Sequence, residues 1–484
     1  MGELHRPNRI VILGCGSVAQ CLLPLLLEHF GFDPRTVTVL ESRDNSARIA
    51  SSLALGVTYE RLEITRDNLV ATLDAHLGAG DLLIDLAWNI ELSELLTWCR
   101  EHRVRYLNTS VEVWDPYDDP ASVNPAQRTL YWRHMALRRL IGSWPDNDGA
   151  PAVVEHGANP GLVSHFTKQA LREIAEAVLL DGLLAERHDQ LRQCLSSGDF
   201  ASLAMHLGVK TIHIAERDTQ ISSTPKQVGE FVNTWSVDGF YEEGVAPAEM
   251  GWGTHERRLP ATAYAHGDEG PRNQICLAQM AHKTLVRSTV PSGPILAMVI
   301  RHGEAFTICD HLTVWDGERA LYRPTVHYAY CPSDAAWASF VELEGAQYRY
   351  PENQRIMNDD IISGRDELGV LVMGHPYKSW WTGMRTTVGE AREVAPHQNA
   401  TTVQVAASIL GAVDWLLRND NGGVRVPDEL PYEEILAVAM PYVGTTWSGP
   451  LDWDPLSTRA NWFDNWSGRE LDHDDPWQFT NFVA

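Results

Sequence analysis

The sequence predicts an α/β fold in which a Rossmann-type parallel-sheet domain precedes a second α+β domain with a mixed or antiparallel sheet. Three observations lead to this prediction. An apolar run at 9–13 breaks into a glycine-rich turn, strand-like and helix-like segments alternate through the first third, and longer strands with hairpin-like spacing follow. We expect domains at 1–150 and 151–390, and a C-terminal segment at 391–484.

The glycine-rich turn has the pattern Gly14-x-Gly16-x-x-Ala19. The first glycine permits a tight turn, the second lets the backbone approach a pyrophosphate, and the third small residue lets helix and strand pack closely. A helix is expected over 17–30, and the free N–H groups at its start would face the phosphates. Ordinary strand-to-helix turns also use glycines, so the residues downstream have to support the assignment.

A second apolar run at 37–40 ends in Glu41, which supplies that support. A carboxylate at the end of the second strand is where the adenosine ribose hydroxyls are held in dinucleotide-binding folds. The sequence therefore predicts a dinucleotide cofactor. Glu41 favours NAD over NADP because a carboxylate repels a 2′-phosphate, although Arg43 nearby leaves NADP open.

The rest of the first domain continues the alternation, with segments at 58–64, 68–77, 82–86, 91–103 and 104–108. Such repetition implies a parallel sheet whose ligands lie at the carboxyl ends of the strands. Polar residues at 85–89 and 108–114 follow buried strands, so cofactor and substrate are expected to meet there. A turn-rich linker at 115–120, a helix at 125–141 and a strand at 151–155 complete the domain.

The second domain is expected to form a mixed or antiparallel sheet from strands at 209–215, 297–300, 305–314 and 325–330. An amphipathic helix is expected at 402–417. It could return to the first domain or form a dimer face. The tail beyond it is rich in Trp and Asp, lacks periodicity, and is expected to run irregularly over the surface.

Composition limits the classes of partner. The chain has 39 Lys and Arg against 64 Asp and Glu, a formal charge of −25, which disfavours nucleic acid and anionic membranes and favours cationic ligands. The 7 cysteines are scattered and form no C-x-x-C pair, so neither a zinc site nor a disulfide framework is expected. With no signal peptide or apolar run of ~18 residues expected, we predict a cytoplasmic protein without a metal.

Asn159 is the first candidate substrate-binding residue. It lies in His-Gly-Ala-Asn-Pro-Gly at 156–161, directly after a strand and before a helix that starts near Val163. The proline biases Asn159 to an extended backbone, which leaves its amide free to reach a ligand. A plain Asn-Pro-Gly turn would explain the same residues.

Glu216 is the second candidate. An apolar strand ends abruptly at Ala215, and the polar residues 216–220 follow, as where a scaffold strand delivers side chains into a cleft. A partly buried Glu216 beside an amine could bind the charge and accept the proton. The alternative is a surface ion pair between Arg217 and Asp218.

Trp235 lies close in sequence to the acids Asp238, Glu242 and Glu243. An indole face attracts ammonium by up to ~2 kcal/mol or more when desolvated, and carboxylates neutralise the charge. An aromatic core strand with solvated acids is the simpler alternative. His302 and the pair at 366–367 are weaker candidates.

Six motifs along nearly the whole chain together resemble bacterial homospermidine synthase, a family related to saccharopine dehydrogenase-like proteins. They are Gly-Cys-Gly-Ser-Val at 14–18, Gly-Ala-Asn-Pro-Gly-Leu-Val-Ser at 157–164, His-Ile-Ala-Glu-Arg-Asp-Thr-Gln at 213–220, Asn-Thr-Trp-Ser-Val-Asp-Gly-Phe at 233–240, Gly-Trp-Gly-Thr at 251–254 and Asp-Pro-Trp-Gln-Phe at 475–479.

The resemblance implies an NAD-dependent, redox-neutral transferase and a homodimer. Two putrescine molecules would give homospermidine and ammonia, and spermidine could replace one of them as donor with release of diaminopropane. The resemblance implies that the residues acting on the amines are Glu216, Glu243, Trp235, Asn159, His302, Glu112 and Asp366. Those expected to hold NAD are Gly14, Gly16, Ser17, Val18, Glu41 and Thr109.

The chain departs from the expected family pattern at two positions, and two other functions compete with the synthase interpretation. Asn89 stands where the family is expected to have an acid, and Ala19 stands where a third glycine is common. One rival is a saccharopine or carboxyspermidine dehydrogenase, which needs an Arg or Lys cluster for its carboxylates, whereas the segments here are acidic and aromatic. The other is a non-catalytic NAD- or polyamine-binding sensor, against which Glu216, Trp235 and Glu243 argue.

Overall fold

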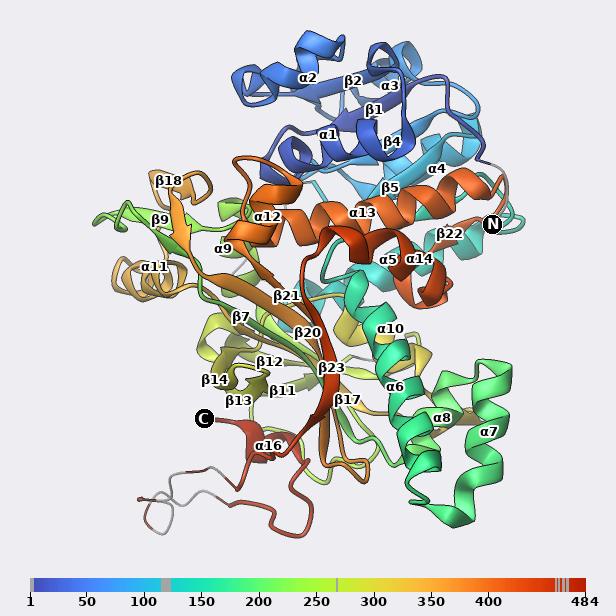
Figure 1. Ribbon diagram of the computed structural model, residues 1–484, viewed down its shortest axis with the longest axis vertical. Coiled ribbons are helices and arrows are strands. Elements are labelled where there is room, and N and C mark those ends of the chain that lie inside the picture. Colours follow the sequence, from blue (N-terminus) through green and yellow to red (C-terminus); the bar gives the residue numbers. More distant parts are fainter. Residues whose placement is uncertain are drawn as a thin grey trace.

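The computed structural model describes residues 4–114, 123–266, 269–457, 459, 462–463, 466 and 470–484. These residues form two large sheets and three small ones, with helices around them (Figure 1). The linker expected at 115–120 lies outside the described residues. The N-terminal sheet, at the top of Figure 1, is parallel, and the larger sheet below it is mixed. The predicted fold class is therefore confirmed.

The first sheet has strand order β22-β6-β5-β4-β1-β2-β3, and every neighbouring pair is parallel. From the central strand β1 the chain builds outward to one side through β2 and β3 and to the other through β4, β5 and β6. Ligands of such sheets bind at this switch point, outside the carboxyl ends of the strands. The strands are β1 (Ile10–Leu13), β2 (Val37–Glu41), β3 (Thr58–Arg61), β4 (Leu82–Asp85), β5 (Arg105–Asn108), β6 (Ala152–Val153) and β22 (Val424–Arg425).

Helices lie between the strands of this sheet because parallel neighbours need crossover connections. All four residues of β1 are buried, as expected for a strand covered on both faces. The helices of this part are α1 (Ser17–Phe30), α2 (Ala50–Leu55), α3 (Leu69–His76), α4 (Leu92–His102) and α5 (Leu130–Ser143).

The second sheet is built around β7 (Thr211–Asp218), which pairs in parallel with β17 (Thr325–Cys331) and antiparallel with β20 (Arg365–Met373). Strand β21 (Ser379–Thr387) continues the sheet beyond β20. Seven of the eight residues of β7 are buried, so this strand lies inside the domain. The remaining strands are β10 (Pro247–Gly251), β11 (Ala263–Ala265), β12 (Gln274–Met280), β13 (Leu285–Val290), β14 (Gly293–Met298) and β23 (Thr446–Leu451).

Two-stranded sheets and helices surround this core. The small sheets pair β8 (Ile221–Ser222) with β19 (Ile361–Ser363), β9 (Glu230–Asn233) with β18 (Asn353–Ile356), and β15 (Val314–Asp316) with β16 (Arg319–Tyr322). The helices are α6 (Leu162–Leu180), α7 (His188–Ser197), α8 (Phe200–Leu207), α9 (Val237–Val245), α10 (Glu304–His311), α11 (Asp334–Gly345), α12 (Val388–Val394), α13 (Ala400–Arg418), α14 (Tyr432–Ala439) and α16 (Phe479–Phe482).

The strand predicted at 305–314 was wrong, because α10 occupies most of these residues and only Val314 enters β15. Ala305, Ile308 and Leu312 recur at helical spacing and are all buried. A short apolar run of this kind is compatible with the period of a strand and with that of a helix, and the structure has the helix.

Helix α13 joins the two parts of the molecule (Figure 1). It packs against α1 and α14 and also touches β20 and β21. It is long and apolar enough to cross a membrane by composition, yet 89% of its most apolar window is buried inside the protein, as in a core helix. The predicted amphipathic pattern is weak, because residues all round the helix are buried.

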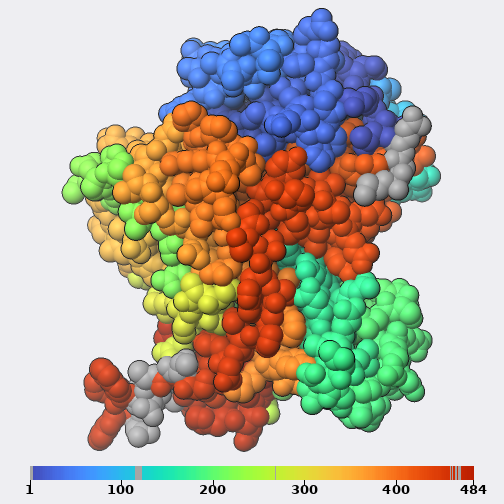
Figure 2. Space-filling model, in the orientation of Figure 1, coloured from blue at the N-terminus to red at the C-terminus, as the bar shows by residue number. Residues whose placement is uncertain are grey.

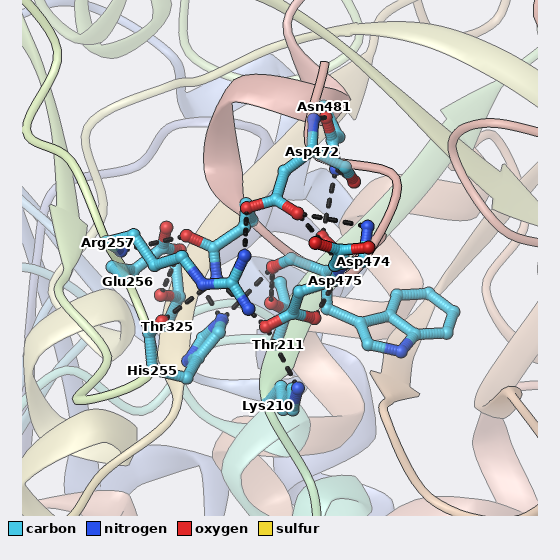
Figure 3. Close-up of polar contacts among 12 residues, drawn as sticks. Lys210, Thr211, His255, Glu256, Arg257, Thr325, Asp472, Asp474, Asp475 and Asn481 are labelled. Atoms are coloured by element: carbon cyan, nitrogen blue, oxygen red, sulfur yellow. Dashed lines mark hydrogen bonds and ion pairs between the residues drawn. The ribbon is translucent and has the colours of Figure 1, made fainter.

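The end of the chain is fastened to the second sheet by polar contacts (Figure 3), and the red C-terminal part runs down the face seen in Figure 2. The carbonyl of Trp477 accepts hydrogen bonds from Thr211 Oγ1 at 2.9 Å and His255 Nε2 at 3.1 Å. Lys210 Nζ pairs with Asp475 Oδ2 at 2.9 Å. We call residues 470–484 and these partners the C-terminal clasp.

Glu256 is the central acceptor of the clasp. Its side chain, only 1% exposed, accepts the Thr325 hydroxyl at 2.7 Å and the Phe479 N–H at 3.1 Å. Thr211 and Thr325 are the first residues of β7 and β17. The clasp therefore holds together the starting ends of two neighbouring parallel strands.

Replacing Glu256 with Ala should lower the free energy of unfolding by ~2–4 kcal/mol, because two buried donors lose their acceptor. Arg258→Ala is the matched control, since its ion pair with Glu470 is 73% and 77% exposed and should matter by less than ~0.5 kcal/mol. Urea-induced unfolding measures both. Equal losses in the two variants would contradict the role of Glu256.

Candidate active site

Three carboxyl groups meet where β7 ends and β20 begins. Glu216 and Asp218 are two residues apart on β7, so they lie on one face of the sheet, and Asp366 of β20 is directly opposite Asp218. On the other neighbour, β17, Tyr330 is opposite Glu216. The carboxyl groups of Glu216, Asp218 and Asp366 are at most 3% exposed. We call these three the acid cluster.

Glu216 is the best-connected member. Its Oε2 accepts the hydroxyl of Tyr328 and the Asn159 amide, the latter at 3.4 Å. Asn159 comes from the loop between β6 and α6, so residues of distant segments converge on one carboxyl group. Gly161 closes that loop with φ +132°, and a side chain there would collide with the Gly157 backbone. This loop, considered above either as a substrate-binding segment or as a plain turn, places the Asn159 amide against Glu216.

Burial raises the pKa of each carboxyl group in the acid cluster. Desolvation, with repulsion from Asp218, raises the pKa of Glu216 to about 8. Burial also raises the pKa of Asp218 to about 6. The pKa of Asp366 is well above its ordinary value because of burial and the charges of Glu216 and Asp218. A cation bound among these groups would favour their ionised forms, so the cluster suits a positively charged ligand.

Thr401 of α13 and Thr234, which precedes α9, each hold one member of the cluster. Thr401, in the first turn, donates to Asp366 Oδ2 at 2.7 Å, and the Thr234 hydroxyl donates to Asp218 Oδ2 at 3.0 Å. Gln220 connects them, because its amide donates to Asp218 at 3.2 Å and to Thr401 at 3.2 Å. The helix N-terminus adds a favourable dipole for negative charge.

His302 lies between two carboxylates next to this cluster. Its Nε2 is 3.3 Å from Glu243 Oε1 and its Nδ1 is 3.0 Å from Glu304 Oε1. Burial opposes the imidazolium, but Glu304 and Glu243 raise the pKa of His302 well above its ordinary value. Its ring is 4.5 Å from that of Tyr328, the residue bonded to Glu216. His302, Glu243 and Glu216 therefore belong to one site.

Aromatic rings flank the acids. Trp235 is half-buried, and its ring lies 6.0 Å from that of Phe240, which is 5.6 Å from Tyr330. Tyr328 and Tyr330 stack at 5.1 Å. Rings beside carboxylates form the kind of surface that binds alkylammonium ions.

Glu112 lies near a second group of charges. Glu242 accepts Arg133 at 2.7 Å and Arg301 at 2.6 Å, and these arginines outweigh burial to lower the pKa of Glu242 to about 2. Burial and repulsion from Glu242 raise the pKa of Glu112 to about 7. Both arginines thus already face a carboxylate. Asn89 stands at the edge of this group, after Trp88, whose indole N–H donates to Glu242 at 3.2 Å.

Buried oxygens of six acids lack a hydrogen-bond partner among the described residues, and four of these acids belong to the groups described above. The four oxygens are Oε2 of Glu243, Oε2 of Glu112, Oε2 of Glu304 and Oδ1 of Asp366. Buried polar atoms are normally satisfied, so each exception calls for a missing partner such as a ligand. Donors on an amine would supply it.

The predicted cofactor residues form one corner of the first sheet. Gly14 has φ +87°, and a Cβ there would lie 2.8 Å from the Leu86 carbonyl oxygen, so only glycine fits. A Cβ at Gly16 would meet nothing within 4 Å, which leaves open space before Ser17 and Val18 at the start of α1. Glu41 Oε2 accepts the Cys15 N–H at 2.7 Å. These residues fit a dinucleotide.

Thr109 lies at the end of β5 on the path toward the acid cluster. A Cβ built at Gly157 would be 3.7 Å from that of Thr109, so the threonine stands against the loop that carries Asn159. Glu41 is ionised, since four hydrogen bonds outweigh its partial burial and lower its pKa. The 157–161 loop thus lies against Thr109 at the end of β5 and reaches the acid cluster through Asn159.

The sequence did not single out Tyr328, Tyr330, Asp218 or Thr401 as site residues. The alternation of Tyr328 and Tyr330 in 325–330 was the available signal, because residues two apart on a strand share a face. The surface ion pair considered for Arg217 and Asp218 is not what the structure has. Asp218 is 3% exposed and bound to Thr234 and Gln220.

Comparison with known proteins identifies the class. The model of the saccharopine dehydrogenase NADP binding domain matches residues 10–153, and that of the saccharopine dehydrogenase C-terminal domain matches residues 157–445. The second match alone covers more than half of the chain. Fold and site thus define a two-domain protein of the saccharopine dehydrogenase class.

Full-length relatives narrow this further. The homospermidine synthase of Blastochloris viridis is 38% identical over 98% of this chain and 97% of its own, and that of Mesorhizobium japonicum is 37% identical over 100% and 97%. A crystal structure of homospermidine synthase from Legionella pneumophila in complex with NAD has a TM-score of 0.86 at 36% identity, covering 99% of this chain and 98% of that one. The chain belongs to the homospermidine synthase family.

Glu216→Gln should flatten the dependence of stability on pH. Glutamate ionises near pH 4.5 when unfolded but only near pH 8 in the folded protein. Between these values folding takes up a proton, so wild-type stability falls as pH rises. Glutamine does not titrate, so the melting temperature of the variant should fall less than that of wild type between about pH 5 and about pH 8. Glu101→Gln, on the exposed surface of α4, is the control, and parallel curves for all three proteins would refute the assignment.

Proposed function

We propose that this chain is an NAD-dependent homospermidine synthase, which joins two putrescine molecules and releases ammonia. Spermidine would serve as an alternative aminobutyl donor and release diaminopropane. The observation that carries the proposal is the buried acid cluster with rings beside it, which the loop after β6 of the first sheet reaches through Asn159. Putrescine is a dication in neutral water, so acids and rings are the chemistry that would recognise it.

The cofactor would be held by the glycine-rich turn and the start of α1. Gly14, Gly16, Ser17 and Val18 would take the pyrophosphate, and Thr109 would line the nicotinamide side. The ionised Glu41 supports NAD over NADP, because it would repel a 2′-phosphate. When bound, NAD supplies an acceptor that takes up a hydride and later returns it.

The diamine would bind with one ammonium against Trp235 and the acid cluster. Asp366, held by Thr401, would share its charge with Glu216, and Asn159 would orient the amine through its contact with Glu216. Binding the cation would pull protons from the cluster, because opposite charge favours carboxylate. Substrate binding would therefore generate the carboxylates that act as bases in the reaction.

Loss of a hydride requires an uncharged amine, so a base must first remove the ammonium proton. With a pKa near 8, Glu216 can accept that proton and release it again near neutral pH. Glu243 is the second base, and His302 would pass protons between Glu243 and Glu304 because it touches both.

The two half-reactions balance. The first putrescine loses a hydride from the carbon bearing its amine and becomes an iminium ion. The amine of the second putrescine adds to that carbon, ammonia leaves, and the returned hydride reduces the new imine to homospermidine. Glu112 would bind the incoming amine, and burial of the site would keep water from hydrolysing the imine.

A substrate with carboxylates is less well supported. The dehydrogenases considered above need cations for their substrates, whereas Arg133 and Arg301 are already bound to Glu242. The grouping of acids, an amide and an imidazole in one site also exceeds what a sensor would need. We further propose that the protein acts as a cytoplasmic homodimer.

Purified protein with labelled putrescine and NAD should form homospermidine and ammonia in equal amounts, because the hydride returns within one turnover. Mass spectrometry identifies the polyamine, and absorbance follows NADH. Glu216→Gln should bind NAD normally but form almost no product. Stoichiometric NADH without a coupled polyamine would replace the proposal with a plain dehydrogenase.

Gly16→Ala should weaken NAD binding by at least about tenfold, or roughly 1.4 kcal/mol, with an unchanged melting temperature. The new methyl meets no protein atom within 4 Å but enters the space expected for the pyrophosphate. Gly14→Ala is the contrasting variant and should lower the melting temperature as well, since it strains the backbone. Calorimetry of binding and unfolding distinguishes them. Normal NAD affinity in Gly16→Ala would exclude this cradle.

A further inference from the structure

Glu155 has an unusual backbone for its residue type. It follows β6 and has φ +61°, in the left-handed region that glycine normally occupies. Glu155 is nevertheless 1% exposed. Residues held in this way persist where the surroundings fix them, and they cluster at functional sites. None of the roles proposed above uses Glu155.

The first domain fixes Glu155 from two sides. Its N–H donates to Asn108 Oδ1 at 2.8 Å, and Asn108 directly precedes Thr109. Its carboxylate Oε2 is 2.7 Å from His134 Nε2 on α5, and both side chains are 2% exposed. The carboxylate therefore has little freedom to move.

The other side of this carboxylate faces the second domain at Gly303. A methyl carbon built on Gly303 would overlap it, and its three nearest atoms all belong to the carboxyl group of Glu155. The backbone of Gly303, with φ −66°, would accept any residue. Glycine is needed there only because the Glu155 carboxylate fills the space of a side chain.

Gly303 lies between His302 and Glu304, the ion pair that belongs to the site. On the other side of His302, Arg301 is tied to Glu242, which Arg133 of α5 also binds. Helix α5 is thus connected, through one carboxylate each, to Arg301 and Gly303, the two neighbours of His302 in sequence. Its Arg133 makes this connection through Glu242, and the adjacent His134 makes it through Glu155.

We propose that Glu155 is a positioning residue for the proposed synthase reaction, packing its carboxylate on Gly303 so that His302 is set at a fixed place relative to the strand ends of the cofactor domain. The inference rests on the proposed function. What matters is the length of the side chain, because its end must reach Gly303 while His134 holds it. The charge matters less.

Glu155→Asp tests length against charge. Aspartate keeps the charge and tolerates a left-handed backbone better than glutamate does, so folding should not suffer. Its carboxylate is one methylene too short for Gly303. We expect kcat to fall roughly 10- to 100-fold, as a small misplacement of catalytic groups can cause, with unchanged NAD affinity and melting temperature. Glu155→Gln, which keeps the length, should retain kcat within about fivefold.

Gly303→Ala provides an independent measurement. Alone it should lower kcat, because its methyl group displaces the carboxylate. Combined with Glu155→Asp it should add less than about a threefold further loss, since the two changes disturb the same contact. Additive losses would overturn the inference.

The remaining outcomes separate the inference from the function. Two results with an active wild type would show that the positioning role is wrong. One is that Glu155→Asp keeps kcat within twofold. The other is that its melting temperature and its number of NAD-binding sites fall in parallel with kcat. A large fall in kcat in Glu155→Gln, with normal kcat in Glu155→Asp, would also overturn the inference. It would show that the charge of Glu155 matters and its length does not. Wild type that makes no homospermidine refutes the proposed function instead.

Discussion

The burial of three carboxyl groups on neighbouring strands is the constraint on which the rest of the structure depends. An unpaired buried carboxylate costs several kcal/mol, and three together repel one another, so without a cation Glu216 and Asp366 hold protons near neutral pH. Their strands cannot separate to relieve this, because β7 is hydrogen-bonded to β17 on one side and β20 on the other. The remaining cost of burial is offset in part by the hydrogen bond from Thr401 to Asp366 and by the N-terminus of α13, which favours negative charge. In the function proposed above, the ammonium group of a bound amine would neutralise this cluster.

The strands that end in this cluster are fixed at their other ends too. Thr211 and Thr325 begin β7 and β17 in register, and the C-terminal clasp binds both through Trp477 and Glu256. From there the strands run without a register shift to Glu216 and its opposite residue, Tyr330. Sheets are stiff along their strands because every ladder bond couples neighbours, so a contact at one end limits movement at the other. The last residues of the chain thus help to keep the acids in place.

Features carried by a local pattern were predictable from sequence. The turn at Gly14 and the acid Glu41 depend on one βαβ unit, and Glu216 stood out because an apolar strand stops before it. Features that depend on pairing between distant segments were not predictable. Glu256 meets its clasp partner more than 200 residues away, as the span from residue 256 to Phe479 shows. The run at 305–314 failed for another reason, because its apolar spacing satisfies a helix as well as a strand.

The titration range of the cluster matters for a reaction that takes a hydride and gives it back. Removing the hydride creates an iminium cation, which negative charge stabilises, and the same charge opposes reduction of the second iminium. A fully ionised cluster would favour the first step at the expense of the last. Acids with pKa values of about 8 for Glu216 and about 6 for Asp218 carry an adjustable charge near neutral pH. In the proposed reaction, protons would move onto the cluster as the cation is reduced, which would lessen the opposition of negative charge to the second hydride transfer.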